Sequence, residues 1–500
     1  MPSTPLRETN RRIIFGLKLK RRRLALGISP SELAERSGLS VSYLNEIEKG
    51  KKFPKEDKIS RLAAALQFSE QELLSPHLDK NMAPLEALLR SNFLNELPMD
   101  RFGIELAKVV EIIAGAPAHV GAFISTLVEL ARNYELQEEH FYQAAMRSYQ
   151  ELYNNFFKDI EDAVLDFADS ADIQLSKPVR SDRLVAALKN VFAVLVREDG
   201  LDAHTGLESL RSLFLPRSRE LLLNSGLTST ERIFQVAKEI GFQRLDAKER
   251  SVTSGMLRVR SFEQVLNHYR ASYFATALLM PKHLFIPDLN SFLARTDWDG
   301  NAFLDLQKSW RVTPEMLFQR LSNLLGSHFG LEDMFFQRMI YDTDKKEFTM
   351  DKELHLSRAQ QPHRSGLGLH YCRRWLSLSL LDEMERMQSE GVYAGSMVGV
   401  QRSHYFGTND TYLSISMARA GYPDSAKRST MTMGILIDDT LRSKVAFCDD
   451  PSIANRTVNI VCETCAIEDC SQRAAPPSRL RAREKEKRIE EEVKKLLAGD

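Results

Sequence analysis

The sequence predicts a mainly α-helical protein with a mixed α/β part at its C-terminal end. Three observations support this class: helix caps spaced closely between residues 29 and 50, apolar residues at three- and four-residue intervals between residues 81 and 176, and short strand-like runs beyond residue 335. At 500 residues the chain is long enough for about three domains. Its composition, 43% hydrophobic and 27% charged, is that of an ordinary globular protein.

The charges are distributed unevenly along the chain. Residues 1–75 contain 15 Lys and Arg against 9 Asp and Glu, a net charge of +6, so the rest of this neutral chain carries −6. A basic N-terminal head on a mildly acidic body suggests that the head meets a polyanion. No run of about 18 apolar residues occurs, and the start, MPSTPLRETNRR, lacks the apolar segment of a secretory signal. We therefore expect a cytoplasmic protein with no membrane partner.

The stretch SPSELAERSGLSVSYLNEIEKGKKFP, residues 29–54, predicts two helices joined by a short turn. Ser29 and Glu32 have the spacing of a capping box, which opens the first helix. Gly38 supplies the positive φ that ends this helix, and Ser40 caps a second helix that runs to Lys49. Two helices joined by a turn of three or four residues that contains Gly form the helix-turn-helix pattern.

The second helix has one apolar side and one polar side. Leu44 and Ile47 fall together and predict the buried side. The opposite side carries hydrogen-bonding side chains of the kind that read base edges in the major groove, where the N-terminal end of such a helix points at the bases. Basic and aromatic neighbours are expected to meet phosphates. The predicted DNA-binding residues are Arg22, Arg23, Ser40, Val41, Ser42, Tyr43, Asn45, Glu46, Lys49, Lys51 and Lys52.

On these motifs, residues 13–74 resemble the lambda-repressor-like, or XRE, DNA-binding domain. The resemblance implies a five-helix bundle that binds double-stranded DNA, usually as a dimer on two half-sites. The alternative is an ordinary helical hairpin whose polar side is only solvated. Between residues 77 and 180 the apolar spacing predicts a helical connector that also helps the chain form a homodimer or a higher homo-oligomer.

The middle of the chain contains a pattern related to a zinc peptidase. The segments FQVAKEIGF and RASYFATALLMP resemble the ImmA/IrrE metallopeptidase domain, in which two histidines of H-E-x-x-H and a ligand from a later helix bind zinc and the Glu acts as general base. Carried over, the ligand positions hold Lys238, Phe242 and Arg270, and only Glu239 matches. Because neither a cation nor a phenyl ring binds zinc, we expect a degenerate domain with no catalytic residues and no enzyme activity.

Other histidines do not restore a metal site in the sequence. His268, His283 and His328 lie nearby but form no ligand pair at helical spacing, so each is interpreted as an ordinary core or surface histidine. A domain that no longer holds metal still has a groove, and grooves bind small molecules.

The C-terminal part alternates strand-like runs with one helix. FFQRMIYDTDKKEFT predicts a strand pair, HYCRRWLSLSLLDEMERM a helix, and four runs predict further strands: VYAGSMVGVQRSHYF, TYLSISMARA, MTMGILID and SKVAFCDD. The segment ends in a cysteine trio with C-x₂-C-x₄-C spacing, formed by Cys462, Cys465 and Cys470. In a cytoplasmic protein this spacing favours zinc or an iron–sulfur cluster over disulfides. A fourth ligand could be Cys372, Cys448, a histidine or an exogenous group, and the alternative is three reduced thiols without metal.

The whole arrangement resembles the short-chain fatty acyl regulators, a group of bacterial transcription factors. The segments YFATALLMP, WRVTPEMLFQRLSNL and CETCAIEDCSQRAAPP carry this resemblance. It implies control of genes for short-chain acyl metabolism, such as the propionate, acetate, glyoxylate or methylcitrate pathways. It also implies an acyl-CoA effector and an iron–sulfur cluster at the cysteine trio.

Five regions are expected along the chain. They are a helix-turn-helix domain over residues 1–76, the connector over 77–180, the degenerate ImmA/IrrE-like domain over 181–345, a sensor domain with the cysteines over 346–477, and a charged helical tail over 478–500. The predicted function is sequence-specific DNA-binding transcriptional regulation in response to a short-chain acyl-CoA or a related metabolite. The alternatives are an iron–sulfur or redox-sensing regulator and an active metallopeptidase.

Overall fold

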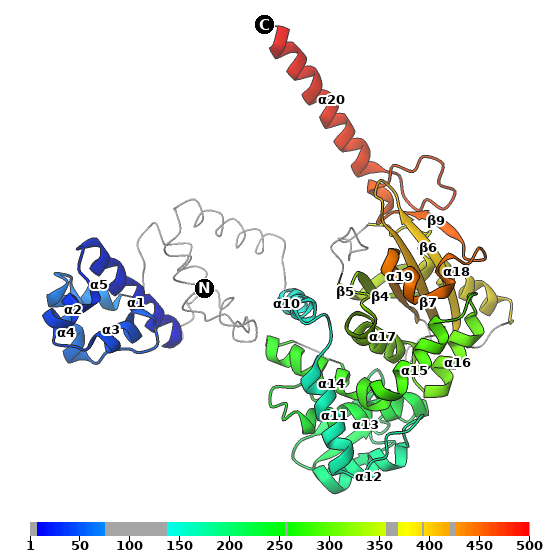
Figure 1. The fold of residues 1–500 in the computed structure, drawn as a ribbon, viewed down its shortest axis with the longest axis horizontal. Helices are drawn as coiled ribbons and strands as arrows, with labels where there is room; N and C mark the ends of the chain where they lie inside the picture. Colours follow the sequence, from blue (N-terminus) through cyan, green and yellow to red (C-terminus); the bar gives the residue numbers. More distant parts are fainter. Residues whose placement is uncertain are drawn as a thin grey trace. The chain divides into compact units, whose positions relative to one another are not determined.

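The computed structural model describes six stretches of the chain, drawn in colour in Figure 1: residues 8–75, 138–255, 259–356, 369–392, 395–420 and 427–499. Two compact units are present, residues 1–146 with 258–265, and residues 147–257 with 266–500. Most of the predicted connector, residues 76–137, lies outside the described residues. No helix in the stretches given above is long and apolar enough to cross a membrane.

The N-terminal head is the five-helix bundle that the resemblance implied. Its helices are α1 (Glu8–Ala25), α2 (Pro30–Ser37), α3 (Val41–Glu48), α4 (Glu56–Ala65) and α5 (Glu70–Leu74). The predicted caps are present: the hydroxyl of Ser29 accepts from the Glu32 N–H at 3.1 Å, and that of Ser40 accepts from the Tyr43 N–H at 3.2 Å. The capping box is only half formed, because the Glu32 carboxylate accepts a hydrogen bond from Arg36 instead.

The bundle is held by an apolar core to which every helix contributes. Leu44 and Ile47 of α3 are buried in it, as predicted, together with Phe15 and Leu19 of α1. Gly16 is needed where α1 crosses α3, because a Cβ at this position would lie 2.3 Å from the Ile47 carbonyl oxygen. Because α1 and α3 pack this closely, the apolar side of α3 is buried and its polar side stays on the surface.

The second unit begins with a helical part that encloses a small sheet. Its helices are α10 (Glu138–Leu152), α11 (Lys158–Ser170), α12 (Ser181–Phe192), α13 (Ser229–Arg244), α14 (Phe262–Leu279), α15 (Lys282–Leu293), α16 (Gly300–Trp310) and α17 (Pro314–Phe329). The first residues of α10 and of α14 belong to the other unit. The sheet has the order β1–β3–β2, formed by β1 (Leu195–Arg197), β2 (Ser212–Leu215) and β3 (Glu220–Leu223).

A buried ion pair fastens α11 to α17. The Arg320 guanidinium, with no exposed side-chain surface, binds both carboxylate oxygens of Glu161, and the Tyr273 hydroxyl donates to the same carboxylate at 2.8 Å. Burial by itself would raise the pKa of Glu161, but the Arg320 charge together with the hydrogen bonds from Arg320 and Tyr273 keeps this pKa below its usual value. Part of the predicted connector is therefore core: α11 belongs to the body of the second unit.

The C-terminal part contains a six-stranded sheet in the order β5–β4–β8–β7–β6–β9. Its strands are β4 (Met334–Asp342), β5 (Glu347–His355), β6 (Met397–Tyr405), β7 (Thr411–Ala420), β8 (Lys427–Leu436) and β9 (Asn455–Val458). All neighbours are antiparallel except β6 and β9. Helix α18 (Leu376–Ser389) covers one face, and α16 contacts Val398 on the other. The strand predicted from SKVAFCDD is wrong: the chain there forms α19 (Asp439–Lys444) and a 3-10 helix (Ala446–Asp449).

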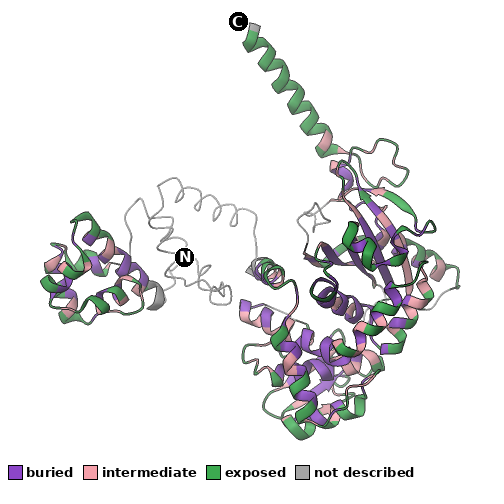
Figure 2. Ribbon diagram, viewed as in Figure 1, coloured by how far each residue is buried: buried purple, intermediate pink, exposed green. Residues whose placement is uncertain are grey.

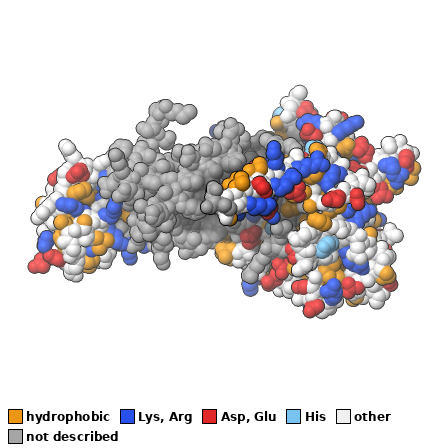
Figure 3. Space-filling model, turned by 90° about the horizontal axis from the view of Figure 1, so that it is seen from above, with side chains coloured by type: hydrophobic (Ala, Val, Ile, Leu, Met, Phe, Trp, Pro, Cys, Tyr) orange, Lys and Arg blue, Asp and Glu red, His pale blue; other side chains and the backbone are white. Residues whose placement is uncertain are grey.

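The last described helix is α20 (Ser478–Gly499), 22 residues long, and its side chains are exposed over residues 481–498 (Figure 2). On the face of the molecule drawn in Figure 3, basic and acidic side chains are interspersed among the coloured atoms. This mixing agrees with a formal net charge of zero over the whole sequence.

Candidate functional site

The polar side of α3 is the first candidate site. Ser42, Asn45 and Lys49 are exposed on it, whereas Leu44 and Ile47 on the opposite side are 1% and 0% exposed. Val41, at the start of the helix, is 38% exposed. The hydroxyl of Ser40 serves as the N-cap. The side of α3 that can meet a ligand therefore carries a hydroxyl, an amide and an ammonium group, with an apolar side chain at its N-terminal end.

Charged and aromatic groups flank this side of α3. Glu46 is paired with Lys52, with 2.7 Å between the carboxylate oxygen and the ammonium nitrogen. The ring of Tyr43 carries the ammonium of Lys58 at 4.3 Å and that of Lys52 at 5.8 Å from its centre. Lys51 and Lys52 lie in the segment between α3 and α4, and Lys58 lies in the first turn of α4, so these three lysines form a basic flank of the polar side.

The two arginines predicted from α1 differ in position. Arg23 is only 7% exposed, and its guanidinium binds both carboxylate oxygens of Glu48 at 2.6 and 2.8 Å. The prediction that Arg23 contacts phosphate is wrong, because this side chain joins α1 to α3 inside the bundle. Arg22 is half-buried and donates to the carbonyls of Leu66 and Gln67, so it closes the end of α4, and its phosphate contact stays a prediction.

The peptidase-like positions lie on α13 and α14. Lys238 and Phe242, four residues apart on α13, are both 5% exposed. The residue of α14 that faces them is His268, because the Lys238 ammonium nitrogen lies 2.8 Å from the His268 Nε2 atom. Arg270 instead reaches Asp159 of α11 at 2.7 Å. Arg270, which the resemblance placed at the third ligand position, is thus engaged with α11, and His268, interpreted as an ordinary core or surface histidine, is half-buried beside Lys238.

The carboxylate of Glu239 is also occupied. It receives two hydrogen bonds from Arg250, at 2.9 and 2.5 Å, and one from Gln243 at 2.7 Å. The Arg250 guanidinium lies over the Phe242 ring, 3.8 Å from its centre. The charge of this carboxylate is thus paired with that of a neighbouring guanidinium through two charge-assisted hydrogen bonds.

Burial makes this cluster less basic than its composition implies. Loss of hydration, followed by the nearby charges of Lys352 and Arg250, lowers the pKa of Lys238 to about 7. Burial and the Lys238 charge likewise lower the pKa of His268 well below its usual value. Both groups therefore favour their neutral forms more than they would in water.

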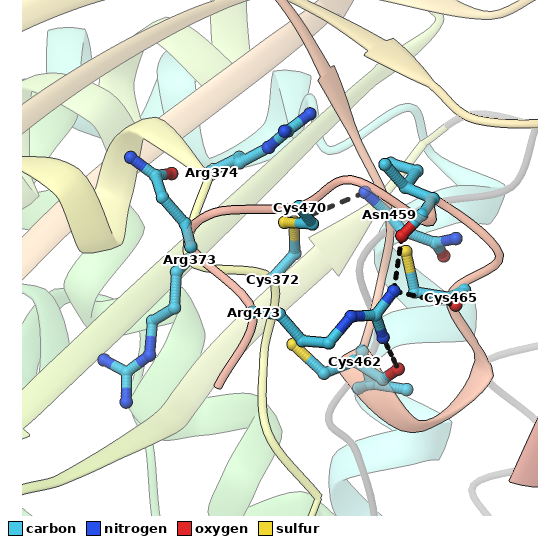
Figure 4. A pocket seen from close by; sticks show the side chains of 11 residues that line it. Cys372, Arg373, Arg374, Asn459, Cys462, Cys465, Cys470 and Arg473 are labelled. Atoms are coloured by element: carbon cyan, nitrogen blue, oxygen red, sulfur yellow. Dashed lines mark hydrogen bonds between the residues drawn. The ribbon is translucent and has the colours of Figure 1, made fainter. Parts of the chain in front are cut away.

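The cysteine trio lies in a second candidate site, where a fourth cysteine joins it. Cys372, Cys462, Cys465 and Cys470 line one pocket together with Arg373, Arg374 and Arg473 (Figure 4). Two segments far apart in sequence bring these residues together: Tyr371 and Val461 form an antiparallel bridge, the Cys372 N–H donates to the Ile460 carbonyl, and the Cys462 N–H donates to the His370 carbonyl.

Hydrogen bonds hold the cysteine loop around the sulfur atoms. Arg473 donates to the carbonyls of Cys462 and Cys465, and the Ala474 N–H lies 3.4 Å from the Cys462 sulfur. The Asn459 N–H lies 3.5 Å from the Cys372 sulfur. Burial raises the pKa of the Cys372 thiol. Over the described stretches, no group of three or more His, Cys, Asp or Glu side chains has the arrangement of a bound metal site.

Of the two predicted candidates for a fourth ligand, the structure brings only Cys372 to the trio. Cys448 is buried in the 3-10 helix, away from the pocket lining, and its carbonyl accepts a hydrogen bond from Arg402 at 2.9 Å.

Comparisons with known proteins agree with the geometry of the head. Residues 19–73 match a helix-turn-helix family model, and residues 192–322 match the IrrE N-terminal-like domain model. The chain is a DNA-binding transcriptional regulator. Along 489 residues it is 21% identical to the propionyl-CoA carboxylase regulator of Cereibacter sphaeroides, covering 94% of this chain and 96% of the relative.

Two solved structures are also similar. A Mycobacterium tuberculosis transcriptional regulator matches at 17% identity and a TM-score of 0.48, covering 66% of this regulator and 92% of that chain. The apo form of the competence regulator ComR from Streptococcus vestibularis matches at 14% identity and a TM-score of 0.13, covering 64% and 88%.

Three residues of the regulator's sites were not identified from the sequence alone. Arg250 neutralises Glu239 from a loop, His268 faces α13 from α14, and Cys372 reaches a trio that lies about 90 residues further along the chain. Cys372 was named only as one of several possible fourth ligands. Helical spacing within one segment could not reveal these contacts, because each partner comes from a different element.

Proposed function

We propose that this regulator binds its operator through the polar side of α3, as a homodimer or higher homo-oligomer, and that its second unit responds to a short-chain acyl-CoA or a related metabolite. The observation that carries the proposal is the placement of α3: it packs closely against α1 at Gly16, and its hydrogen-bonding side is exposed. The near full-length similarity to a propionyl-CoA carboxylase regulator supports the effector class.

The two sets of residues on and around α3 have different tasks in this proposal. Ser42, Asn45 and Glu46 offer the hydroxyl, amide and carboxylate groups that distinguish base edges in the major groove. Lys49, Lys51 and Lys52 meet phosphates, which gives affinity that falls with salt but little sequence choice. The pairing of Glu46 with Lys52 orients the carboxylate before DNA arrives.

The second unit acts in this proposal as a sensor without peptidase activity. Lys238 and Phe242 do not supply the two imidazoles of the zinc site: the Lys238 amino group is engaged with His268, and the phenyl ring has no donor atom. Glu239, which would activate water, is held by Arg250. An acyl-CoA can change the affinity for DNA only to the extent that it binds one arrangement of the two DNA-binding heads better than the other.

The direct test is a fluorescence-anisotropy titration of the full chain against its own upstream DNA and a scrambled duplex of equal length, at several salt concentrations. We expect a preference for the upstream DNA that persists at each salt concentration. Repeating the titration with propionyl-CoA, acetyl-CoA and free CoA then tests the effector. Equal affinity for both duplexes at every salt concentration would contradict the DNA-reading role. An unchanged preference with all three CoA compounds would contradict only the effector.

A second candidate input is iron or redox state, and the cysteine pocket favours it. Four cysteines from two segments line one pocket, two of the sulfur atoms have backbone N–H groups within hydrogen-bonding distance, and three arginines lie in the lining. Cysteine thiolates are the ligands of iron–sulfur clusters and of structural zinc, so the donor atoms suit either group, although these side chains are not arranged as a metal site in the described residues. A bound cation would remove the proton that burial keeps on the Cys372 thiol.

Anaerobic purification followed by iron and zinc analysis tests this candidate. We expect Cys372→Ser to lower the metal content as strongly as Cys462→Ser does, whereas Cys448→Ser leaves it at the wild-type level. A metal content that is equal in all three variants would contradict a four-cysteine site. DNA affinity that responds to acyl-CoA but not to oxidation would show that the cysteines are structural rather than the input.

The remaining alternative, an active metallopeptidase, is tested separately. A variant lacking Cys462, Cys465 and Cys470 cannot hold metal at the cysteine pocket, so zinc bound to it would have to lie elsewhere. We expect no stoichiometric zinc in this variant. One zinc per chain would favour the peptidase and contradict the sensor role of the IrrE-like domain.

A further inference from the structure

Three side chains converge between α13 and α14 at the distances of a metal site. In an H-E-x-x-H helix, two residues four apart bind one metal ion from the same side. Here those positions are 238 and 242, and the ring of His268 lies 6.2 Å from that of Phe242, centre to centre. Two imidazoles on one zinc ion lie about 5 Å apart by the same measure, because each Zn–N bond is about 2.1 Å long and the bonds diverge tetrahedrally.

The Lys238 amino group lies where these three side chains meet. Its nitrogen is 2.8 Å from the His268 Nε2 atom, 3.1 Å from the Ser254 carbonyl oxygen and 5.8 Å from the centre of the Phe242 ring. It therefore joins α13, α14 and the loop at residue 254 through one nitrogen, as a metal ion joins its ligands. The Arg250 guanidinium lies over the Phe242 ring, 3.8 Å from its centre, and binds the Glu239 carboxylate.

The Nδ1 atom of His268 shows that this imidazole is not placed by a partner of its own. It is buried and has no hydrogen-bond partner among the described atoms. The hydrogen bond to the Lys238 amino group therefore sets the direction of Nε2. It leaves Nε2 presented toward the place where the three side chains meet, as a metal-binding imidazole presents a ring nitrogen to its ion.

We propose that positions 238, 242 and 268 are the three ligand positions of a lost metal site, that His268 is its surviving ligand, and that the Lys238 amino group and the Arg250 guanidinium now occupy the places of the metal ion and its water. Position 270 has no part in this site, since Arg270 is committed to Asp159. The inference does not depend on the proposed effector or on the cysteine pocket.

The test restores two ligands and asks whether the third is present. The variant Lys238→His with Phe242→His is titrated with Co²⁺, and the absorption of four-coordinate Co²⁺ is measured as the difference from the unmodified regulator, since the cysteines are the same in both. We expect one further Co²⁺ per chain. Adding His268→Ala should weaken this binding by more than the roughly 10–100-fold that loss of an outer-shell partner costs. Adding Arg270→Ala should leave the binding unchanged.

Two results would overturn the proposal. One is a folded double variant that binds no further Co²⁺, and the other is binding that needs Arg270 and not His268. If the double variant does not fold, as judged by its far-ultraviolet circular dichroism, the milder Lys238→His variant takes its place with Cu²⁺. Two-imidazole coordination should then appear in the electron paramagnetic resonance spectrum and disappear with His268→Ala; absence of that signal in the folded single variant would equally overturn the proposal.

Discussion

Neighbouring side chains of the head have different roles despite their similar chemistry. Arg23 is buried against Glu48 and joins two helices, whereas Lys51 and Lys52 lie in the exposed segment after α3. Charge density along the sequence does not separate these cases, because the helical phase of each residue decides whether it faces the core or the solvent. Two DNA-binding predictions follow at this scale.

The first concerns a lysine of the basic flank. We expect Lys51→Ala to weaken binding to upstream and scrambled DNA about equally and to reduce the slope of log affinity against log salt by roughly one unit. The measurement is anisotropy titration over a range of salt. Lys308→Ala on α16 removes an equal charge from an exposed side chain and is the matched control. A loss confined to the upstream sequence would mean that Lys51 reads bases.

The second concerns the side chains that read bases. We expect Ser42→Ala and Glu46→Ala to lower the preference for upstream over scrambled DNA by about 1–3 kcal/mol for each lost base contact. The salt slope should stay as it is, because no phosphate contact is removed. An unchanged preference, with all affinities lowered together, would show that this side of α3 only positions the head. Because Glu46 pairs with Lys52, the Ser42 variant is the cleaner of the two.

The third prediction concerns the buried Lys238 amino group. Its pKa of about 7 in the folded chain lies below its usual value near 10.4. Between these values the unfolded chain holds a proton that the folded chain lacks, so stability rises with pH, by up to about 1.4 kcal/mol for each pH unit. The charges around it are those of Lys352, Arg250, Arg211 and Glu315.

We therefore expect the free energy of unfolding of the wild type, relative to Lys238→Met, to increase between pH 7 and pH 9. Denaturant titrations of both proteins at each pH measure this difference, and the cysteines and tyrosines that also titrate cancel in it. A difference that does not vary with pH would contradict a buried, weakly basic amino group.

At the scale of elements, α11 belongs to the body because its apolar side chains Ile160, Val164 and Phe167 are buried there together with one charge pair. The predicted connector continued to residue 180, since α11 has the same apolar spacing as a free-standing amphipathic helix. Its contact with α17 rests on Glu161 and Arg320, which are both almost fully buried. Periodicity reveals that a helix has an apolar side, but not which element covers that side.

This pair leads to the fourth prediction. We expect Glu161→Gln to destabilise the second unit by about 3–5 kcal/mol, because it leaves the Arg320 charge buried without a partner. Thermal or denaturant unfolding measures the loss. The matched control is Asp162→Asn, the adjacent acidic residue, whose solvent-exposed pair with Lys158 should contribute little to the free energy of unfolding. Similar losses in both variants would contradict the buried role of Glu161.

At the scale of the whole molecule, the proposed effector and the operator bind to different units, so their coupling must be reciprocal. If propionyl-CoA changes the affinity for the upstream DNA by some factor, the DNA must change the affinity for propionyl-CoA by the same factor. Calorimetric titration of propionyl-CoA into the free regulator and into its DNA complex measures this fifth prediction. Unequal factors would show that the two binding events do not share one equilibrium.

The sequence by itself determined the helix-turn-helix, the buried and exposed sides of α3, and the strand pair of β4 and β5. It also determined that two zinc-ligand positions hold other residues. Each of these features depends only on residues close together along the chain. Tertiary structure alone decided that Arg23 is buried, that His268 rather than Arg270 faces α13, and that Cys372 rather than Cys448 joins the cysteine trio. In each of these cases the partner comes from a distant segment. Such contacts depend on how whole helices and strands pack together, and the spacing of residues along the sequence does not reveal that packing.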